Sequence, residues 1–123
     1  MARLRRATVA VALLAAGLVF SSCGTGGAVT EARISCGFVA RALNLQAQSE
    51  MTGLTTPQRE KLRADAMSEL LKGTQAAANA TSIDGSWNPL QTTINEAERV
   101  PLKDLVPALT RLCKVANSST PYL

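Results

Sequence analysis

The side chains in this chain best able to do chemistry are three cysteines, Cys23, Cys36 and Cys113. A thiol can be acylated, can join a disulfide, can bind a metal ion or can act as a nucleophile beside a base. The chain has no histidine, so the usual base and a common zinc ligand are both missing. Cys36 and Cys113 also lack the close ligand spacing of structural zinc sites. The pattern therefore argues against a metal site and against catalysis by a cysteine with a histidine base, and we expect no metal and no cofactor.

The residues before Cys23 have the layout of an export signal. Three arginines, at positions 3, 5 and 6, precede an uncharged and mostly apolar run from 7 to 20. Two small residues, Ser21 and Ser22, separate this run from Cys23. A basic head, a short apolar run and small residues at the end are typical of secretion signals. The run is shorter than the roughly 20 residues that an ordinary membrane-spanning helix needs.

The segment Phe20-Ser21-Ser22-Cys23 resembles the lipobox of bacterial lipoproteins, although these proteins usually have leucine or another aliphatic residue in place of Phe20. The resemblance implies removal of residues 1–22, lipidation of Cys23, for instance with palmitate, and anchoring at the outer face of the cell membrane. The abundance of alanine, arginine and glycine is compatible with an actinobacterial source. Two alternatives stay open: an ordinary signal cleaved after Gly26-Gly27-Ala28, and an uncleaved anchor.

Both cleavage routes leave Cys36 and Cys113 as the two remaining thiols. A disulfide can persist outside the cytoplasm, so we expect a Cys36–Cys113 bond. The alternative is two buried free thiols, because cysteine is also a good small core residue.

The positive charge of the chain comes largely from the export signal. The whole chain has 13 basic and 9 acidic residues, a net charge of +4. Removal of the signal takes away three arginines and no acidic residue. Ten basic and nine acidic residues then remain, which gives a net charge of +1. A nucleic-acid-binding protein needs a basic surface in its mature form, so we expect no nucleic-acid partner.

About 100 mature residues allow one small domain, and the abundance of leucine and alanine favours helices. Apolar spacing predicts an all-α fold, a small antiparallel bundle of three to four helices with one disulfide joining the first helix to the last. Gly24 to Gly27 are predicted to be flexible. The expected divisions are a signal at 1–22, a lipidated cysteine and tether at 23–28, a helical domain at 29–117 and a flexible tail at 118–123. The expected helices cover 29–48, 57–80, 88–99 and a stretch from 101 onward.

Local signals refine three of these helices. Thr56 is the expected N-cap before Pro57, and Gln91 is placed for a capping box in the third helix. Pro107 interrupts the apolar stripe of the last helix, and because the stripe stays in phase across it we expect a kink rather than a break.

The sequence contains no recognisable catalytic constellation. Glu96 and Glu98 are two positions apart and would point in different directions on a helix, so we expect no enzyme. We expect instead a non-catalytic envelope protein that binds a protein partner, with a carrier of a lipid or other apolar molecule as the alternative. Trp87 is a possible partner contact, because tryptophan is enriched at binding hot spots. The interpretation that we favour is that it packs over the end of the bundle, because tryptophan has a large apolar area.

Overall fold

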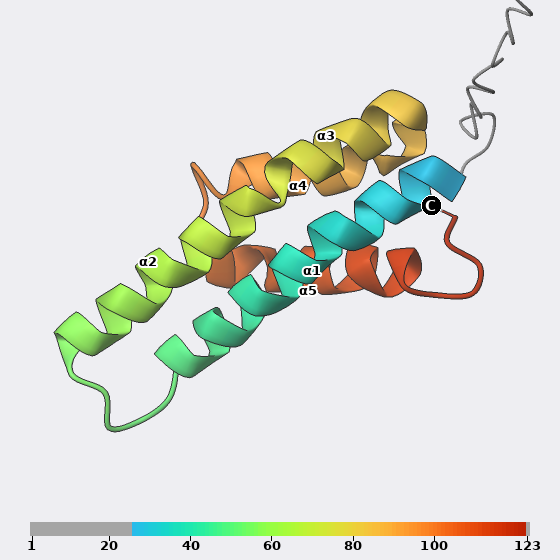
Figure 1. Ribbon diagram of the computed structural model, residues 1–123. Helices are drawn as coiled ribbons and strands as arrows, with labels where there is room; N and C mark the ends of the chain where they lie inside the picture. The colour runs from blue at the N-terminus through green and yellow to red at the C-terminus, as the bar shows by residue number, and fades with distance from the viewer. Residues whose placement is uncertain (1–25, 123) are drawn as a thin grey trace, which may run out of the picture.

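Residues 26–122 are described by the computed structural model, and they form an all-helical domain (Figure 1). The elements in chain order are α1 (Gly26–Ser49), α2 (Thr56–Lys72), α3 (Thr74–Ile83), a short 3-10 turn η1 (Gly85–Trp87), α4 (Asn88–Glu96) and α5 (Leu102–Ala116). These described residues contain no strand. The expectation of a helical bundle is confirmed.

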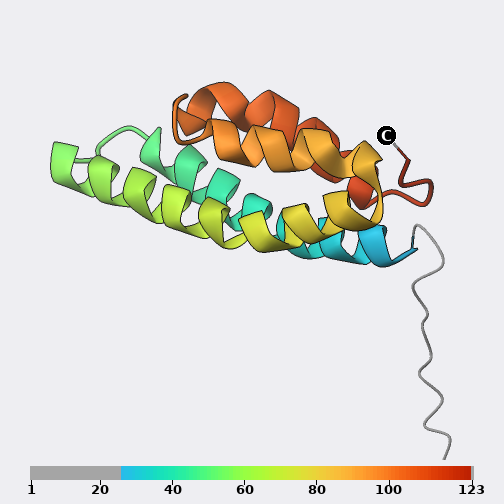
Figure 2. The ribbon, with the colours of Figure 1, turned by 90° about the horizontal axis from the view of Figure 1, so that it is seen from above.

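The helices lie in two layers. In one layer α1 packs against α2 and α3, which follow each other almost as a single rod, and in the other layer α4 lies beside α5 (Figure 2). The end of α1 and the start of α2 extend beyond α4 and α5 as a hairpin arm (Figures 1 and 2). This arm leaves a corner where α2 passes the beginning of α5.

The core combines small side chains, which come mainly from the first layer, with larger ones, most of which come from η1 and the second layer. Alanines let helices approach closely, whereas leucine, isoleucine and tryptophan fill the space between layers. The buried alanines of the first layer are Ala28, Ala32, Ala42, Ala66, Ala76, Ala77 and Ala80, and the large fully buried side chains include Leu70, Trp87, Leu90, Ile94 and Leu109.

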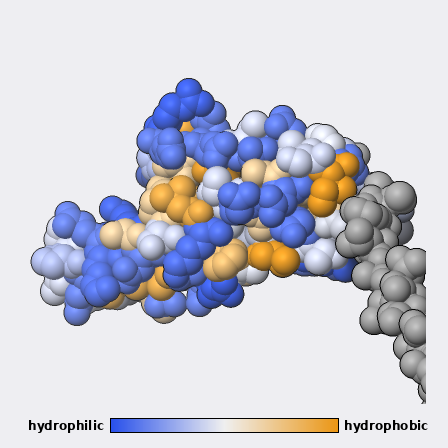
Figure 3. All heavy atoms as spheres, turned by 45° about the horizontal axis from the view of Figure 1, so that its top comes forward, coloured by the Kyte–Doolittle hydropathy of each residue, from blue (hydrophilic) through white to orange (hydrophobic). Residues whose placement is uncertain are grey.

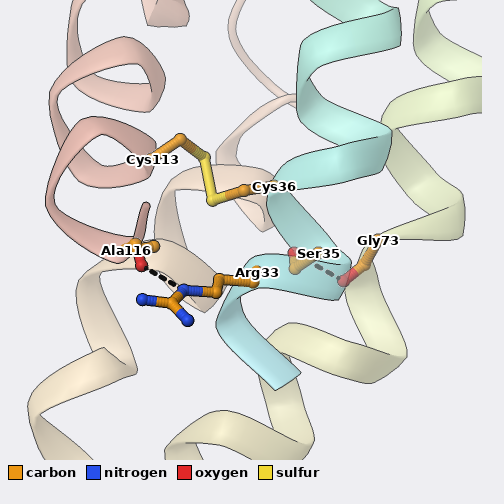
Figure 4. The surroundings of a disulfide bond; sticks show 6 residues. All are labelled: Arg33, Ser35, Cys36, Gly73, Cys113 and Ala116. Carbon is orange, nitrogen blue, oxygen red and sulfur yellow. Dashed lines mark hydrogen bonds between the residues drawn. A yellow bond between two sulfur atoms is a disulfide. The ribbon is translucent and has the colours of Figure 1, made fainter. Parts of the chain in front are cut away.

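The expected helix over 57–80 is wrong in one respect, because it is divided at Gly73 into α2 and α3. Gly73 is buried where this rod crosses α1. The Ser35 hydroxyl donates a hydrogen bond to the Gly73 carbonyl at 2.9 Å (Figure 4). A Cβ on Gly73 would lie 3.1 Å from both the carbonyl oxygen and the Oγ of Ser35. The absence of a side chain at position 73 therefore lets the two helices meet.

Replacing Gly73 with alanine tests this close approach. We expect Gly73→Ala to lower the free energy of unfolding by about 1–2 kcal/mol, because crowding against Ser35 outweighs the better helix propensity of alanine. The matched control is Gly37→Ala within α1, where an added Cβ meets nothing within 4 Å. That control should stabilise the protein by about 0.5–1 kcal/mol. Equal stabilisation by both changes, measured by urea denaturation, would contradict the account.

Two helix starts differ from the expectation. The first helix begins at Gly26 rather than Val29, so Gly26 to Ala28 are helical and the expected tether at 23–28 overlaps α1. Thr55, not Thr56, caps α2: its backbone is extended, and its side chain and that of Gln58 form a reciprocal capping box. Thr56 is already inside the helix.

The second layer also departs from the expectation at its helix ends. The third expected helix ends at Glu96 rather than near Arg99, and no capping box with Gln91 forms. Trp87 precedes α4 in a helical conformation carried over from η1 and makes no side-chain cap, so the extended N-cap that such a box needs is missing. The last helix runs without a break through Pro107.

Polar side chains tie the helices together outside the core. The Arg33 guanidinium donates to the carbonyl of Ala116, the last residue of α5, at 2.8 Å (Figure 4). It also donates to the carbonyl of Ser118, just beyond that helix, at 3.2 Å. Glu69 on α2 pairs with Lys72 on its own helix and with Arg41 on α1. Hydrogen bonds from these two cations lower the pKa of the Glu69 carboxyl below its usual range, and the bond from Lys72 has the larger effect. Such exposed pairs each stabilise the fold only slightly.

Candidate functional site

The predicted site residues fall in three different places. Cys23 lies outside the described residues, so its lipidation stays a prediction. Cys36 and Cys113 form a disulfide, as expected, with their Cα atoms 5.5 Å apart (Figure 4). The bond joins α1 to α5, and Cys36 is only 2% exposed. It links the two layers from within the core, which gives it a structural role.

Trp87 does not form a surface anchor. Its side chain is 1% exposed and belongs to the core cluster at the end of η1. A large aromatic ring at a junction between layers removes more apolar area from water by packing inward. The suggestion that Trp87 contacts a partner is therefore wrong for this fold, and the alternative of packing at the end of the bundle fits.

A cleft lies instead in the corner between the hairpin arm and the second layer. It has a volume of about 410 Å³ and is lined by residues from α1, from α2 and from the start of α5. We call it the α2–α5 cleft, and its lining residues are Gln46, Arg63, Met67, Pro101, Leu102 and Lys103. Figure 3 shows apolar side chains gathered where the arm meets the rest of the bundle, surrounded by hydrophilic ones.

The cleft combines an apolar floor with a cationic rim. Met67 is partly buried and Leu102 is buried. The side chains of Arg63 and Lys103 are exposed. Among residues 26–122, neither of these two cations is in an ion pair. The side-chain amide of Gln46, which is buried, donates to the carboxylate of Glu50, just after α1, at 3.1 Å.

The cleft lies far from the beginning of α1. Gln46 is 20 positions after Gly26 in one continuous helix, and a rise of 1.5 Å per residue gives a separation of about 30 Å along the axis. The opposite end of the bundle holds the start of α1 beside the end of α3, where a Cβ on Gly27 would lie 3.7 Å from Ile83. The cleft and the start of α1 therefore lie at opposite ends of the bundle.

Residues 26–122 contain neither a cluster of metal-binding side chains nor a helix that could span a membrane. No group of three or more histidine, cysteine, aspartate or glutamate residues in this range is placed to hold a metal ion. None of the helices in this range is both long enough and apolar enough to cross a membrane.

Sequence reasoning did not identify the cleft. Arg63 and Met67 are four positions apart on α2 and share a face, which is a signal that could have been seen. However, a methionine in a helical stripe is most simply a core residue, and an exposed arginine is most simply a solvated one.

Comparisons with protein-family models, with curated proteins and with solved structures give no match, so the geometry alone supports any functional conclusion.

Proposed function

We propose that this protein is an exported, lipid-anchored and non-catalytic module that binds a protein partner through the α2–α5 cleft. The observation that carries the proposal is the position of the cleft at one end of α1 while the chain enters the fold at the other. Such an arrangement separates anchoring from recognition along a single helix.

The packing at the start of α1 supports processing at Cys23. Ala28 is 0% exposed and belongs to the core, and Gly27 lies against Ile83. Cleavage after Ala28 would remove both positions and open the core at this end. Cleavage before Cys23 leaves all of α1 intact, so the lipobox-like site suits this fold better than the ordinary cleavage site.

Anchoring at Cys23 would hold one end of the bundle close to the membrane. Only Gly24 and Thr25 separate Cys23 from the start of α1. Three Cα–Cα steps reach at most about 11 Å. The cleft, about 30 Å further along α1, would then face away from the membrane, where a partner in the envelope can reach it.

The carrier of a lipid or other apolar molecule is the second candidate. Its support is the cleft volume of about 410 Å³, which is within the range of small-molecule pockets. Two observations favour a protein partner instead. The cleft opens at the end far from the proposed anchor, where a carrier would not take lipid directly from that membrane, and its rim carries two cations.

Energy transfer to the membrane tests this arrangement. A donor dye is attached to an introduced cysteine at Ser82→Cys near the start of α1, or at Ala64→Cys beside the cleft, in protein reconstituted with acceptor-labelled lipid. The two positions are about 27 Å apart along the α2–α3 rod. We expect much stronger transfer from position 82 than from position 64.

Two features make this measurement decisive. Protein without an introduced cysteine should take up no dye, because Cys36 and Cys113 are bonded and Cys23 carries lipid. Equal transfer from both positions, or stronger transfer from position 64, would contradict the proposed orientation. Absence of transfer from either position would contradict anchoring altogether.

A further inference from the structure

We propose that the α2–α5 cleft recognises an acidic segment of its partner, with a large apolar side chain on the floor and carboxylates against the cationic rim. This inference rests on the proposed function, since it names the chemistry of the partner for the same site.

The floor of the cleft suits one large apolar group. Its apolar lining residues are Met67 from α2, and Pro101 and Leu102 from the beginning of α5. Leu71 follows Met67 by one helical turn on the same face of α2 and is 42% exposed, so the apolar surface continues beyond the cleft. Methionine adapts its shape readily to an inserted side chain. An unbranched or aromatic apolar residue of a partner would therefore bury area here.

The rim of the cleft determines the charge of the segment. Arg63 comes from α2 and Lys103 from α5, so positive charge stands on two sides of the apolar floor. Neither side chain has an ion-pair partner within residues 26–122. Glu50, the acidic residue nearest along the chain to Gln46, is held by the Gln46 amide. Carboxylates complement this rim, and arginine can bind one in a bidentate manner.

The shape of the cleft favours a peptide over a fatty acid. Three of the six lining residues are apolar, and the apolar side chains gathered where the arm meets the rest of the bundle have hydrophilic ones around them (Figure 3). A long acyl chain needs an enclosed apolar path to bury most of its surface. A peptide side chain beside a carboxylate needs only the short floor and the charged rim that this cleft presents.

Binding of two peptide pools tests the proposal. Both pools contain dye-labelled eight-residue peptides with one fixed phenylalanine, and their random positions are drawn from glycine, serine and either the two acidic or the two basic residues. The full protein, reconstituted in bilayer discs of zwitterionic lipid, is titrated and fluorescence anisotropy is followed. We expect the acidic pool to bind at least tenfold more tightly than the basic pool.

Variants of the rim locate the binding. Arg63→Glu with Lys103→Glu should weaken binding of the acidic pool by about tenfold or more, and the neutral pair Arg63→Gln with Lys103→Gln by about three- to tenfold. The matched control makes the same charge change at exposed positions of α5 further along the helix, Arg111→Glu with Lys114→Glu, and should weaken it less than twofold. Thermal unfolding of each variant confirms that it is folded.

Three outcomes would overturn the proposal. The first is equal binding of the acidic and basic pools, including binding of neither. The second is equal weakening by the rim and control pairs, which would indicate attraction to overall charge. The third is that decanoate displaces the acidic pool and binds the protein more tightly than the pool does, which would favour the carrier function. Each outcome is separable from a failure of anchoring, because energy transfer to the membrane does not depend on the cleft.

Discussion

Loss of the Cys36–Cys113 disulfide lowers the free energy of unfolding by about 4.5 kcal/mol in the variant Cys36→Ala with Cys113→Ala. The two cysteines are 77 positions apart, so the bond removes a large part of the conformational entropy of the unfolded chain. A small domain has only about 5–15 kcal/mol of stability in total. The protein without the bond should therefore unfold at a much lower urea concentration.

Chemical denaturation of oxidised and reduced protein measures this effect. Reductant should destabilise the unmodified protein and leave the double alanine variant unchanged, which separates the bond from other effects of the reagent. A difference below about 1 kcal/mol between oxidised and reduced protein would mean that the unfolded chain is little restrained by the bond, contrary to our expectation.

The link between the first and last helices could be predicted from residue types alone. Two cysteines remained once the export signal was set aside, and each lay on or near an apolar face of a predicted helix. The all-helical class followed from the spacing of leucine and alanine in the same way. The helical class depends on the local spacing of apolar residues, and the disulfide follows because only two cysteines are left to pair. Neither prediction requires knowledge of how the helices pack.

The division of the α2–α3 rod at Gly73 depends on a residue far away in the sequence, Ser35. A glycine inside a helical pattern costs only about 1 kcal/mol, so the pattern alone does not predict a division. What distinguishes Gly73 from Gly37 is the backbone of Ser35 across the helix crossing. That neighbour is known only once α1 and the α2–α3 rod are placed against each other.

The cleft was beyond sequence reasoning for a similar reason. Its cations, Arg63 and Lys103, come from separate helices and look like ordinary surface residues. They face a common space because the α1–α2 hairpin is longer than the layer formed by α4 and α5 (Figure 2). The expected helix bounds did not predict this arm, because the expected helix over 57–80 is divided into α2 and α3 and the helix over 88–99 ends earlier, at Glu96.

The second large effect concerns membrane retention. We expect Cys23→Ala to move most of the protein from the membrane fraction to the soluble fraction, because the acyl chains that we propose as its anchor would be missing. The control Ser22→Ala keeps a small residue before Cys23 and should leave the protein in the membrane fraction. Unchanged retention of the Cys23→Ala protein would show that something other than this thiol holds it there.

The mass of the N-terminal peptide of the mature protein tests the central claim most directly. We predict a peptide that begins at Cys23 and carries the mass of at least two acyl chains, since a single chain gives only marginal membrane binding. Gly26 to Ala28 should remain in the mature chain, where Ala28 completes the core. A mature chain that begins at Val29, or an unmodified Cys23, would contradict the account.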